Sequence, residues 1–303
     1  MHNGLLFTGD IHLRPDVPVC RTDDFLVAQW AKFEQIQKLA KRKNLAWIDA
    51  GDVFHKAIQP LHFVNQVLTR LHYPICAGIA GNHDLPSHNT GRVMESVWGT
   101  LRAVGYIEEA LGDRPLCVNS SEHRVAEIYG AHYGEAIPDP YDEQPGIFKV
   151  LVMHGMVYAS RNDIIPNAPG SMAKKLLRDH KGYDLIVTGH NHQSFMVELN
   201  GRHLVNPGSM TRQTADQADH IPRIVTWTPK DGLQWHALTC EPDVVSREHL
   251  VKKEQKEEQL SAFVQSLQDV GEVSLSFEDN VETVIRENKP DKPVKDKVRE
   301  AME

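Results

Sequence analysis

The sequence predicts an α/β fold in which short buried strands alternate with amphipathic helices. Two observations carry this prediction. Apolar runs and helical stripes alternate in the order β-α-β-α-β over residues 1–84, and each of these strands runs into a polar cluster that contains a glycine. Right-handed crossovers make such strands parallel. We therefore expect the polar clusters to meet on one edge of a sheet, where open α/β sheets bind ligands.

The first half of the chain supplies three of the expected strands. They cover residues 5–7, 45–50 and 75–80, and each is a short apolar run. A helix is expected after Asp24, because apolar residues then recur at helical spacing up to Ala40. The basic residues 41–43 suit the negative end of that helix dipole. A second helix over residues 60–71 leads to the third strand.

The second half resumes the same pattern after a less regular stretch. We expect a helix over 93–104 and a strand over 125–132, followed by a proline-rich acidic loop up to Pro145. Strands over 149–153 and 184–188 again end in histidines. A strand over 203–205 leads into a turn at residues 206–209, and residues 223–228 and 233–238 are expected to pair as a hairpin.

The composition shifts after about Glu241, which predicts two domains, residues 1–240 and 241–303. Residues 260–267 carry a helical apolar stripe, residues 273–277 alternate like a strand, and residues 281–286 and 294–302 suit short helices. We therefore expect a small C-terminal α/β appendage. It either caps the catalytic domain or binds a partner.

Composition and charge narrow the class of protein. The chain has 303 residues, is 41% hydrophobic and 24% charged, and carries a formal net charge of −8. That charge disfavours bulk electrostatic binding of DNA, but it permits a nuclease whose metals meet the phosphate. The four cysteines are widely spaced and are expected to be reduced. No signal peptide or long apolar run is present, so we expect a cytoplasmic protein without a membrane span.

The polar clusters themselves predict a metal site. One such cluster alone is more often a turn or a surface loop. Five clusters at five strand ends call for a convergent site. The candidate ligands are Asp10, His12, Asp52, Asn82, His154, His190 and His192. They offer nitrogen and oxygen but no sulfur, a set that suits Mn, Fe or Zn. Seven ligands exceed one tetrahedral site and fit two metals that share a carboxylate.

In this arrangement the sequence resembles the calcineurin-like metallophosphoesterases over residues 3–210. The motifs that carry the resemblance, in family order, are Gly9-Asp10-Ile11-His12, Gly51-Asp52, Gly81-Asn82-His83-Asp84, His154 and Gly189-His190-Asn191-His192. The resemblance implies a two-layer β-sandwich flanked by helices, with two divalent metals at the strand ends. One metal would be held by Asp10, His12, Asp52 and His192, and the other by Asp52, Asn82, His154 and His190. His83, held by Asp84, would protonate or stabilise the leaving oxygen after attack by a hydroxide that bridges the metals.

Within that family the chain looks most like the SbcD-type DNA-repair nucleases. Its third motif ends in Asp84 where protein phosphatases carry Glu, and residues 51–54 are close to the nucleases' second motif. It departs from them at His55, where they usually have Asp, and at residues 13–15. The short length resembles phage-encoded members. The resemblance implies exonuclease or endonuclease activity on DNA, an SMC-like ATPase partner of the SbcC type, and homodimers. Arg212, after the turn at residues 206–209, would meet a substrate phosphate.

Two other functions fit the same residues. The chain could be a metallophosphoesterase that acts on nucleotides or phosphoproteins. It could also be a non-catalytic binding subunit that keeps the fold, although a complete ligand set argues against that. For the metals we expect Mn²⁺, with Fe, Zn or Mg as alternatives.

Overall fold

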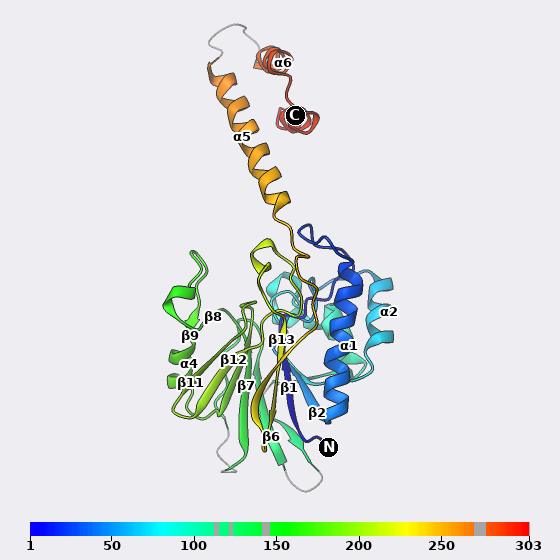
Figure 1. The fold of residues 1–303 in the computed structure, drawn as a ribbon, viewed down its shortest axis with the longest axis vertical. Coiled ribbons are helices and arrows are strands. Elements are labelled where there is room, and N and C mark those ends of the chain that lie inside the picture. Colours follow the sequence, from blue (N-terminus) through cyan, green and yellow to red (C-terminus); the bar gives the residue numbers. More distant parts are fainter. Residues whose placement is uncertain (112–114, 121–123, 141–145, 270–276, 303) are drawn as a thin grey trace. The chain divides into compact units, whose positions relative to one another are not determined.

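The computed structural model describes residues 1–303 except 112–114, 121–123, 141–145, 270–276 and 303. The chain divides into two compact units, Met1–Val244 and Val245–Glu303. In the first unit two six-stranded sheets pack face to face, with helices on the outer faces (Figure 1). This confirms the predicted mixed α/β fold, a β-sandwich flanked by helices.

The first sheet has the strand order β14-β13-β1-β2-β3-β4. Its strands are β1 Gly4–Thr8, β2 Leu45–Asp49, β3 Ile75–Gly78, β4 Ile107–Glu109, β13 Arg223–Thr228 and β14 Gly232–Ala237. The strands β1 to β4 pair in parallel, as the crossover argument predicts. The predicted hairpin, β13 and β14, adds antiparallel to β1. The parallel pairing brings the ends of β1, β2 and β3 to one edge.

The second sheet has the order β11-β12-β10-β7-β6-β5. Its strands are β5 Leu116–Asn119, β6 Arg124–Ala131, β7 Phe148–His154, β10 Leu185–Gly189, β11 Phe195–Leu199 and β12 Arg202–Asn206. The four strands from β6 to β12 run parallel, with β5 and β11 antiparallel at the edges. A separate pair, β8 Val157–Tyr158 and β9 Ser171–Met172, lies outside both sheets. Both β7 and β10 therefore end on the same edge of this sheet.

In the described part of this unit, four α-helices cover the sandwich. They are α1 Phe25–Lys43, α2 Leu61–Arg70, α3 Val97–Ala103 and α4 Ala173–Asp179, and the short 3₁₀ turns are Pro86–His88, Thr90–Glu95, Arg161–Asp163 and Ala215–Gln217. The Asp24 side chain caps α1 by accepting from the Val27 N–H, 3.1 Å away, as the sequence predicts. The helix expected over 93–104 is instead broken at Ser96, which caps α3. The serine hydroxyl competes with the helical pattern there.

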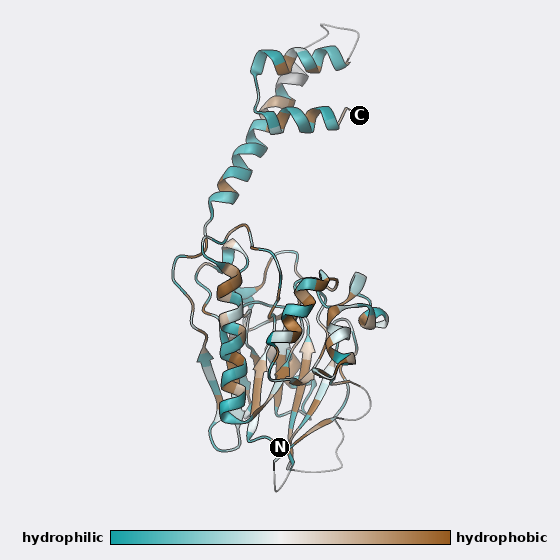
Figure 2. Ribbon diagram, turned by 90° about the vertical axis from the view of Figure 1, so that its right-hand side faces the viewer, coloured by the Kyte–Doolittle hydropathy of each residue, from teal (hydrophilic) through white to brown (hydrophobic). Residues whose placement is uncertain are grey.

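The core explains why the strands are apolar on both faces. Leu6 packs in the cluster under α1, α2 and α3, whereas its neighbours Leu5 and Phe7 pack between the two sheets. Leu151 and Ile186 of the second sheet pack under α4. Figure 2 shows brown, hydrophobic residues gathered on the strands, whereas the helices carry teal residues as well. Alternate residues of each strand thus face different layers, and both layers are buried.

The second unit, Val245–Glu303, contains the helices α5 Glu248–Asp269, α6 Phe277–Asn288 and α7 Lys292–Glu300. Its core cluster holds Phe263, Val281, Val284 and Ile285. The helices expected around 281–286 and 294–302 are present. The strand expected over 273–277 lies mostly outside the described residues, but its last residue, Phe277, begins α6, so that part of the prediction is wrong. The apolar spacing of residues 277, 281, 284 and 285 is helical and outweighs the short alternation.

Among the described residues, none of the helices combines the length and the hydrophobicity that a membrane span requires.

Candidate metal centre

All seven candidate ligands lie where strands of the two sheets end. Asp10 and His12 follow β1, Asp52 follows β2 and Asn82 follows β3, while His154 ends β7, and His190 and His192 follow β10. The loops of the two sheets are joined directly. The backbone N–H of His190 donates to both carboxylate oxygens of Asp10, at 2.9 and 3.0 Å. The two sets of strand ends therefore form one site.

The first ligand group consists of Asp10, His12 and His192, one ligand atom of each lying within 4.8 Å of the others. The two Nε2 atoms of His12 and His192 are only 3.0 Å apart, and they lie 3.9 and 3.8 Å from Oδ1 of Asp10. Two imidazole lone pairs at that distance repel each other unless a proton or a cation lies between them. The buried Asp10 carboxylate next to them suits a cation.

The second ligand group consists of Asp52, Asn82, His154 and His190. Nε2 of His154 lies 3.3 Å from Oδ2 of Asp52 and 3.2 Å from Oδ1 of Asn82, and that amide oxygen lies 2.8 Å from Nδ1 of His190. Ligand atoms about 2.0–2.2 Å from a metal lie roughly 3–3.5 Å from each other. The spacing within the second ligand group is therefore that of a ligand shell.

Asp52 stands between the two groups. Its Oδ2 lies 3.6 Å from Nε2 of His12 on one side and 3.3 Å from Nε2 of His154 on the other. Its Oδ1 is occupied, because it accepts the backbone N–H of His83 at 2.8 Å. This single oxygen, Oδ2, is the atom that two metals would share.

The residues fit the metals that the motifs imply. Nδ1 of His154 lies 2.7 Å from the carbonyl oxygen of Ala50, and a carbonyl can only accept. Nδ1 therefore carries the proton and leaves Nε2 as the ligand atom, the arrangement usual for histidines that bind metals. His154 is 3% exposed and Asp52 is 1% exposed, so these two ligands are also shielded from water.

The electrostatics of the site favour positive charge as well. Burial lowers the pKa of His154, but the charge and hydrogen bond of Asp52 outweigh it and raise that pKa to about 10. Burial also favours neutral Asp52, yet the charge of His154 holds its pKa well below the usual range. By contrast, burial lowers the pKa of His190 to about 4. A metal held by His154 and Asp52 would displace the proton that these two residues share.

Four of the candidate ligands have a positive φ angle, a backbone conformation that residues other than glycine rarely adopt. The φ angles are 51° at Asp10, 49° at His12, 57° at Asp52 and 81° at His190. Non-glycine residues in this region cost of order 1–3 kcal/mol and cluster at functional sites. The loops after β1 and β2 hold this conformation by pairing with each other, since the N–H of His12 donates to the carbonyl of Asp52 at 2.9 Å.

The side chains of His83 and Asp84 have different hydrogen-bond partners in the structure. Nδ1 of His83 lies 2.8 Å from the carbonyl oxygen of His55, so the ring is held by that backbone group. Asp84 is fully buried and accepts the backbone N–H groups of residues 53, 54 and 81, at 3.2, 2.9 and 3.1 Å. The prediction that Asp84 holds His83 is therefore wrong. The carboxylate binds orphan backbone donors and shapes the loops after β2 and β3.

The side chain of Arg212 makes contacts within the protein. It is 7% exposed, and its guanidinium donates to the carbonyls of Ala218 and Glu241 and to Sγ of Cys240, at 3.1, 3.1 and 3.0 Å. These contacts engage three of the guanidinium's N–H donors, and contact with a substrate phosphate stays a prediction. Arg212 joins the segment that follows the turn at residues 206–209 to residues 218, 240 and 241.

That turn supports the ligand loops directly. The N–H of Ser209 donates to the carbonyl of His192 at 3.1 Å, and the N–H of Met210 donates to the carbonyl of Asp10 at 3.2 Å. Gly208 has φ 77°, and an added Cβ would lie 2.8 Å from the His192 carbonyl oxygen. Glycine is therefore required where this loop passes the ligands.

Sequence reasoning missed two residues beside the site. His55, noted only as a departure from a motif, stacks on His83 with ring centroids 5.5 Å apart. Tyr133 lies just past the end of β6, and its ring lies 5.7 Å from that of His190. The position of Tyr133 after a parallel strand could have marked it, because every such strand end points to the same edge.

Comparison with known proteins shows which family has this series of motifs. The model of the family "Calcineurin-like phosphoesterase" matches residues 5–194, more than half of the chain. No curated protein gives a significant match.

Solved structures resemble the chain weakly. An archaeal phosphodiesterase is 14% identical with a TM-score of 0.41, covering 77% of this chain and 99% of that one. The protein TT1561 of Thermus thermophilus is 13% identical with a TM-score of 0.46, covering 79% and 100%. A putative 5'-nucleotidase from Staphylococcus aureus is 13% identical with a TM-score of 0.46, covering 85% of this chain and 58% of that one.

Proposed function

Since the chain belongs to the calcineurin-like phosphoesterase family, we propose that it is a phosphodiesterase that hydrolyses DNA with two divalent metal ions. One observation carries the proposal furthest. Oδ2 of Asp52 lies between the first and second ligand groups, within 3.6 Å of a histidine nitrogen in each. A shared carboxylate of this kind is what a two-metal phosphoryl-transfer site needs.

The residues that would hold the metals are the two ligand groups described above, with Asp52 common to both. When bound, the two cations supply Lewis-acid chemistry that draws charge from the phosphoryl oxygens. The mixed imidazole, amide and carboxylate ligands suit Mn²⁺, with Fe, Zn or Mg as alternatives. The completeness of the set favours an enzyme over a non-catalytic binding subunit.

His83 would supply the proton that the leaving oxygen needs. Its Nδ1–H is fixed on the carbonyl of His55, so Nε2 is the nitrogen left to exchange a proton. Its ring lies 4.9 Å from that of His12, which places it beside the first ligand group. A general acid of this kind contributes roughly 10²–10⁴-fold to a rate.

Two features support DNA as the substrate. The sequence motifs around Asp84 and residues 51–54 resemble those of SbcD-type nucleases. In addition, Tyr133 and the exposed His88 form an aromatic pair, with centroids 6.0 Å apart, next to the ligand His190. Aromatic side chains of this kind stack on bases and tolerate any sequence. With a net charge of −8, affinity for DNA would come from these local contacts and from the metals rather than from a basic surface.

The purified chain tests this directly with labelled linear, circular and single-stranded DNA in the presence of Mn²⁺. We expect cleavage that a chelator abolishes and that the Asp52→Asn variant lacks. Nucleotides, a phosphoserine peptide and bis-p-nitrophenyl phosphate serve as competing substrate classes. Hydrolysis of these small substrates without any cleavage of DNA would overturn the DNA proposal and favour a phosphoesterase that acts on nucleotides or phosphoproteins.

We also propose that residues 245–303 bind a protein partner, which the resemblance suggests is an SMC-like ATPase subunit. The support is an apolar hollow of about 700 Å³ in this unit, lined by residues of α5, α6 and α7. Phe277, on its edge, is 65% exposed, which is unusual for a large aromatic side chain. Assembly into homodimers stays a prediction.

A further inference from the structure

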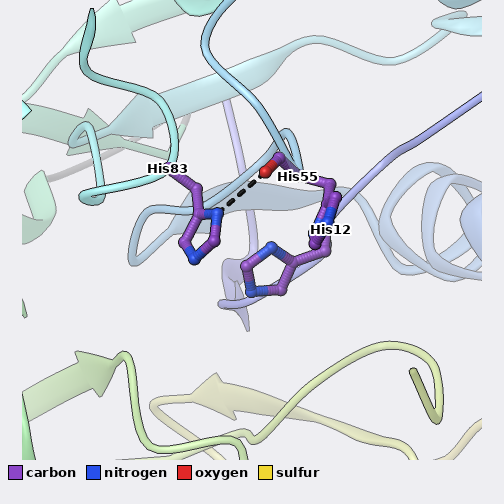
Figure 3. Close-up of side chains that lie close together, drawn as sticks. All are labelled: His12, His55 and His83. Carbon is purple, nitrogen blue, oxygen red and sulfur yellow. Dashed lines mark hydrogen bonds between the residues drawn. The ribbon is translucent and has the colours of Figure 1, made fainter. Parts of the chain in front are cut away.

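Three histidines gather beside the first ligand group, on the side away from Asp10. They are His12, His55 and His83, which we call the histidine trio, and one ring nitrogen of each lies within 4.8 Å of the others. Figure 3 shows the three rings converging from separate loops. These loops follow β1, β2 and β3, so the parallel pairing of the first sheet brings the trio together.

The backbone holds the trio in place. The carbonyl of Leu13 accepts the N–H of His55 at 3.0 Å, and the N–H of Leu13 donates to the carbonyl of Val53 at 2.8 Å. The loops after β1 and β2 thus continue to pair beyond the sheet. The carbonyl of His55 in turn fixes the ring of His83. The backbone that carries His12 and His55, and the ring of His83, are therefore held by hydrogen bonds that do not depend on any ligand.

Each member of the trio has a ring nitrogen to offer. Nδ1 of His12 and Nδ1 of His55 are buried, and neither has a hydrogen-bond partner among the described residues. His12 as a whole is 2% exposed. His83 uses Nδ1 on the His55 carbonyl, which leaves Nε2. Buried polar atoms without partners are rare, and each calls for an explanation such as a water or an ion.

His12 connects the trio to the first ligand group. Its Nε2 lies 3.0 Å from Nε2 of His192, and its Nδ1 is the unpartnered atom on the other side of the ring. In Figure 3 the ring nitrogen of His12 nearest its own backbone faces His83 and His55. One imidazole thus has a nitrogen in each of two sites.

The ligand chemistry of the trio differs from that of the two ligand groups. Those groups contain carboxylate and amide oxygens, which Mn²⁺ and Mg²⁺ accept, whereas the trio offers imidazole nitrogen only. Three histidines are a set that zinc binds, with its fourth position open. Hard cations such as Mg²⁺ prefer oxygen and retain their water.

We propose that the histidine trio is a third metal site, which shares His12 with the first ligand group and which binds Zn²⁺ but not Mg²⁺ or Mn²⁺. Zinc binding at Nδ1 of His12, while another cation occupies Nε2, requires loss of the ring proton and brings two cations near each other. The third ion is therefore expected to bind more weakly than the first two and to appear only at excess zinc.

Zinc at this site would also inhibit hydrolysis, and this part rests on the proposed function. Nε2 of His83 cannot hold a proton for a leaving oxygen while its lone pair is on a metal. Excess zinc should therefore suppress DNA cleavage even when the two ligand groups are loaded.

The decisive experiment counts metal and does not need activity. The full-length chain is stripped with a chelator, dialysed against rising concentrations of zinc or of manganese, and analysed for bound metal. We expect about three equivalents of zinc but about two of manganese for the wild type. His55→Ala should bind about two of either metal, because it removes one ligand of the trio and none from the other groups.

Two control variants test whether a change in the number of bound metal ions is specific to the histidine trio. His62, on α2, is exposed and belongs neither to the histidine trio nor to either ligand group, so His62→Ala should bind zinc as the wild type does. His55→Gln keeps a polar side chain at this position and should match His55→Ala, and circular dichroism checks the fold of both variants. Cobalt can replace zinc as a probe, since its visible spectrum should change on filling the third site in the wild type only.

Three results would overturn the third site. They are only two zinc equivalents in the wild type, three retained in His55→Ala, or a third equivalent lost equally in His62→Ala. If no sample cleaves DNA, the proposed function fails while the metal count still decides the third site. If the count supports the site but excess zinc leaves cleavage unchanged, the inhibitory part is wrong.

Discussion

The imidazole of His83 donates a hydrogen bond from Nδ1 to the main-chain carbonyl oxygen of His55, across 2.8 Å. A carbonyl oxygen cannot donate, so this contact decides which ring nitrogen carries the fixed proton. It also holds the ring next to His12, with centroids 4.9 Å apart. A backbone carbonyl thus holds the His83 ring beside the site, although His83 belongs to neither ligand group.

The first prediction follows from this contact. His83→Ala should retain both metals and bind DNA, yet turn over roughly 10²–10⁴-fold more slowly, because it lacks the proton donor. The loss should shrink on bis-p-nitrophenyl phosphate, whose leaving group needs no proton. Metal analysis and single-turnover rates on both substrates make the test, with His83→Gln as the matched variant. Loss of metal, or an equal loss of rate on both substrates, would contradict the assigned role.

The second prediction concerns the shared oxygen of Asp52. Asp52→Asn replaces one carboxylate oxygen by a donor that cannot ligate, so metal content should fall at both positions and hydrolysis should be abolished. Elemental analysis of the dialysed protein measures the loss. Asp49→Asn is the control, since Asp49 is equally buried but belongs to neither ligand group. Two full equivalents of metal in an active Asp52→Asn variant would remove the bridging role.

The third prediction concerns stability against pH. Burial raises the pKa of Asp49 to about 7, from an ordinary value of 3.8, although Thr8 and the Gly51 N–H donate to it. Between these values the folded chain binds the proton more tightly than the unfolded chain does. The free energy of unfolding should therefore fall as the pH rises from about 4 to 7, by about 4 kcal/mol in all.

The Asp49→Asn variant isolates this effect, because it cannot ionise. Denaturant unfolding with metal chelated, at pH values from 5 to 8 (a range of about three units), should show the wild type losing stability relative to the variant as the pH rises. A difference between the two proteins that stays constant with pH would show that Asp49 does not titrate in this range.

The fourth prediction concerns residues 245–303. A chain that ends at Val244 should bind both metals and hydrolyse bis-p-nitrophenyl phosphate at the wild-type rate, because no candidate ligand lies beyond that point. It should differ in the binding of DNA or of a partner protein. Phe277→Asp in the full-length chain should reproduce that difference, since it places a charge on the exposed apolar surface. If neither change affects DNA or partner binding, this unit has no such role.

Several features of the fold could be predicted from local sequence. The alternation of apolar runs with helical stripes predicted the parallel strands, because hydrophobic periodicity follows directly from backbone geometry. Parallel strands end on one edge, so the polar residues after them were expected to converge. The structure brings Asp10 next to His192 and Asp52 next to His190, as that argument requires. The prediction of one helix over residues 93–104 was less accurate, because the hydroxyl of Ser96 interrupts that helix.

The direction of each loop side chain depended on contacts from distant parts of the chain. Asp84 follows His83 in sequence, yet its carboxylate turns to backbone N–H groups of residues 53 and 54. Arg212 lies after the glycine turn near the ligands, yet carbonyls of residues 218 and 241 hold it elsewhere. Neighbours in sequence do not predict such contacts, because buried polar groups pair with whichever partner the fold supplies.

The sequence by itself determined which residues end the strands, and therefore the composition of the candidate metal site, since strand periodicity and chain order are local properties. Only the tertiary structure decided that Oδ2 of Asp52 faces both ligand groups and that His55 joins His12 and His83. These relations rest on loops that pair beyond the sheet and hold Asp10, His12 and Asp52 at positive φ. Such strained conformations persist only where long-range hydrogen bonds enforce them.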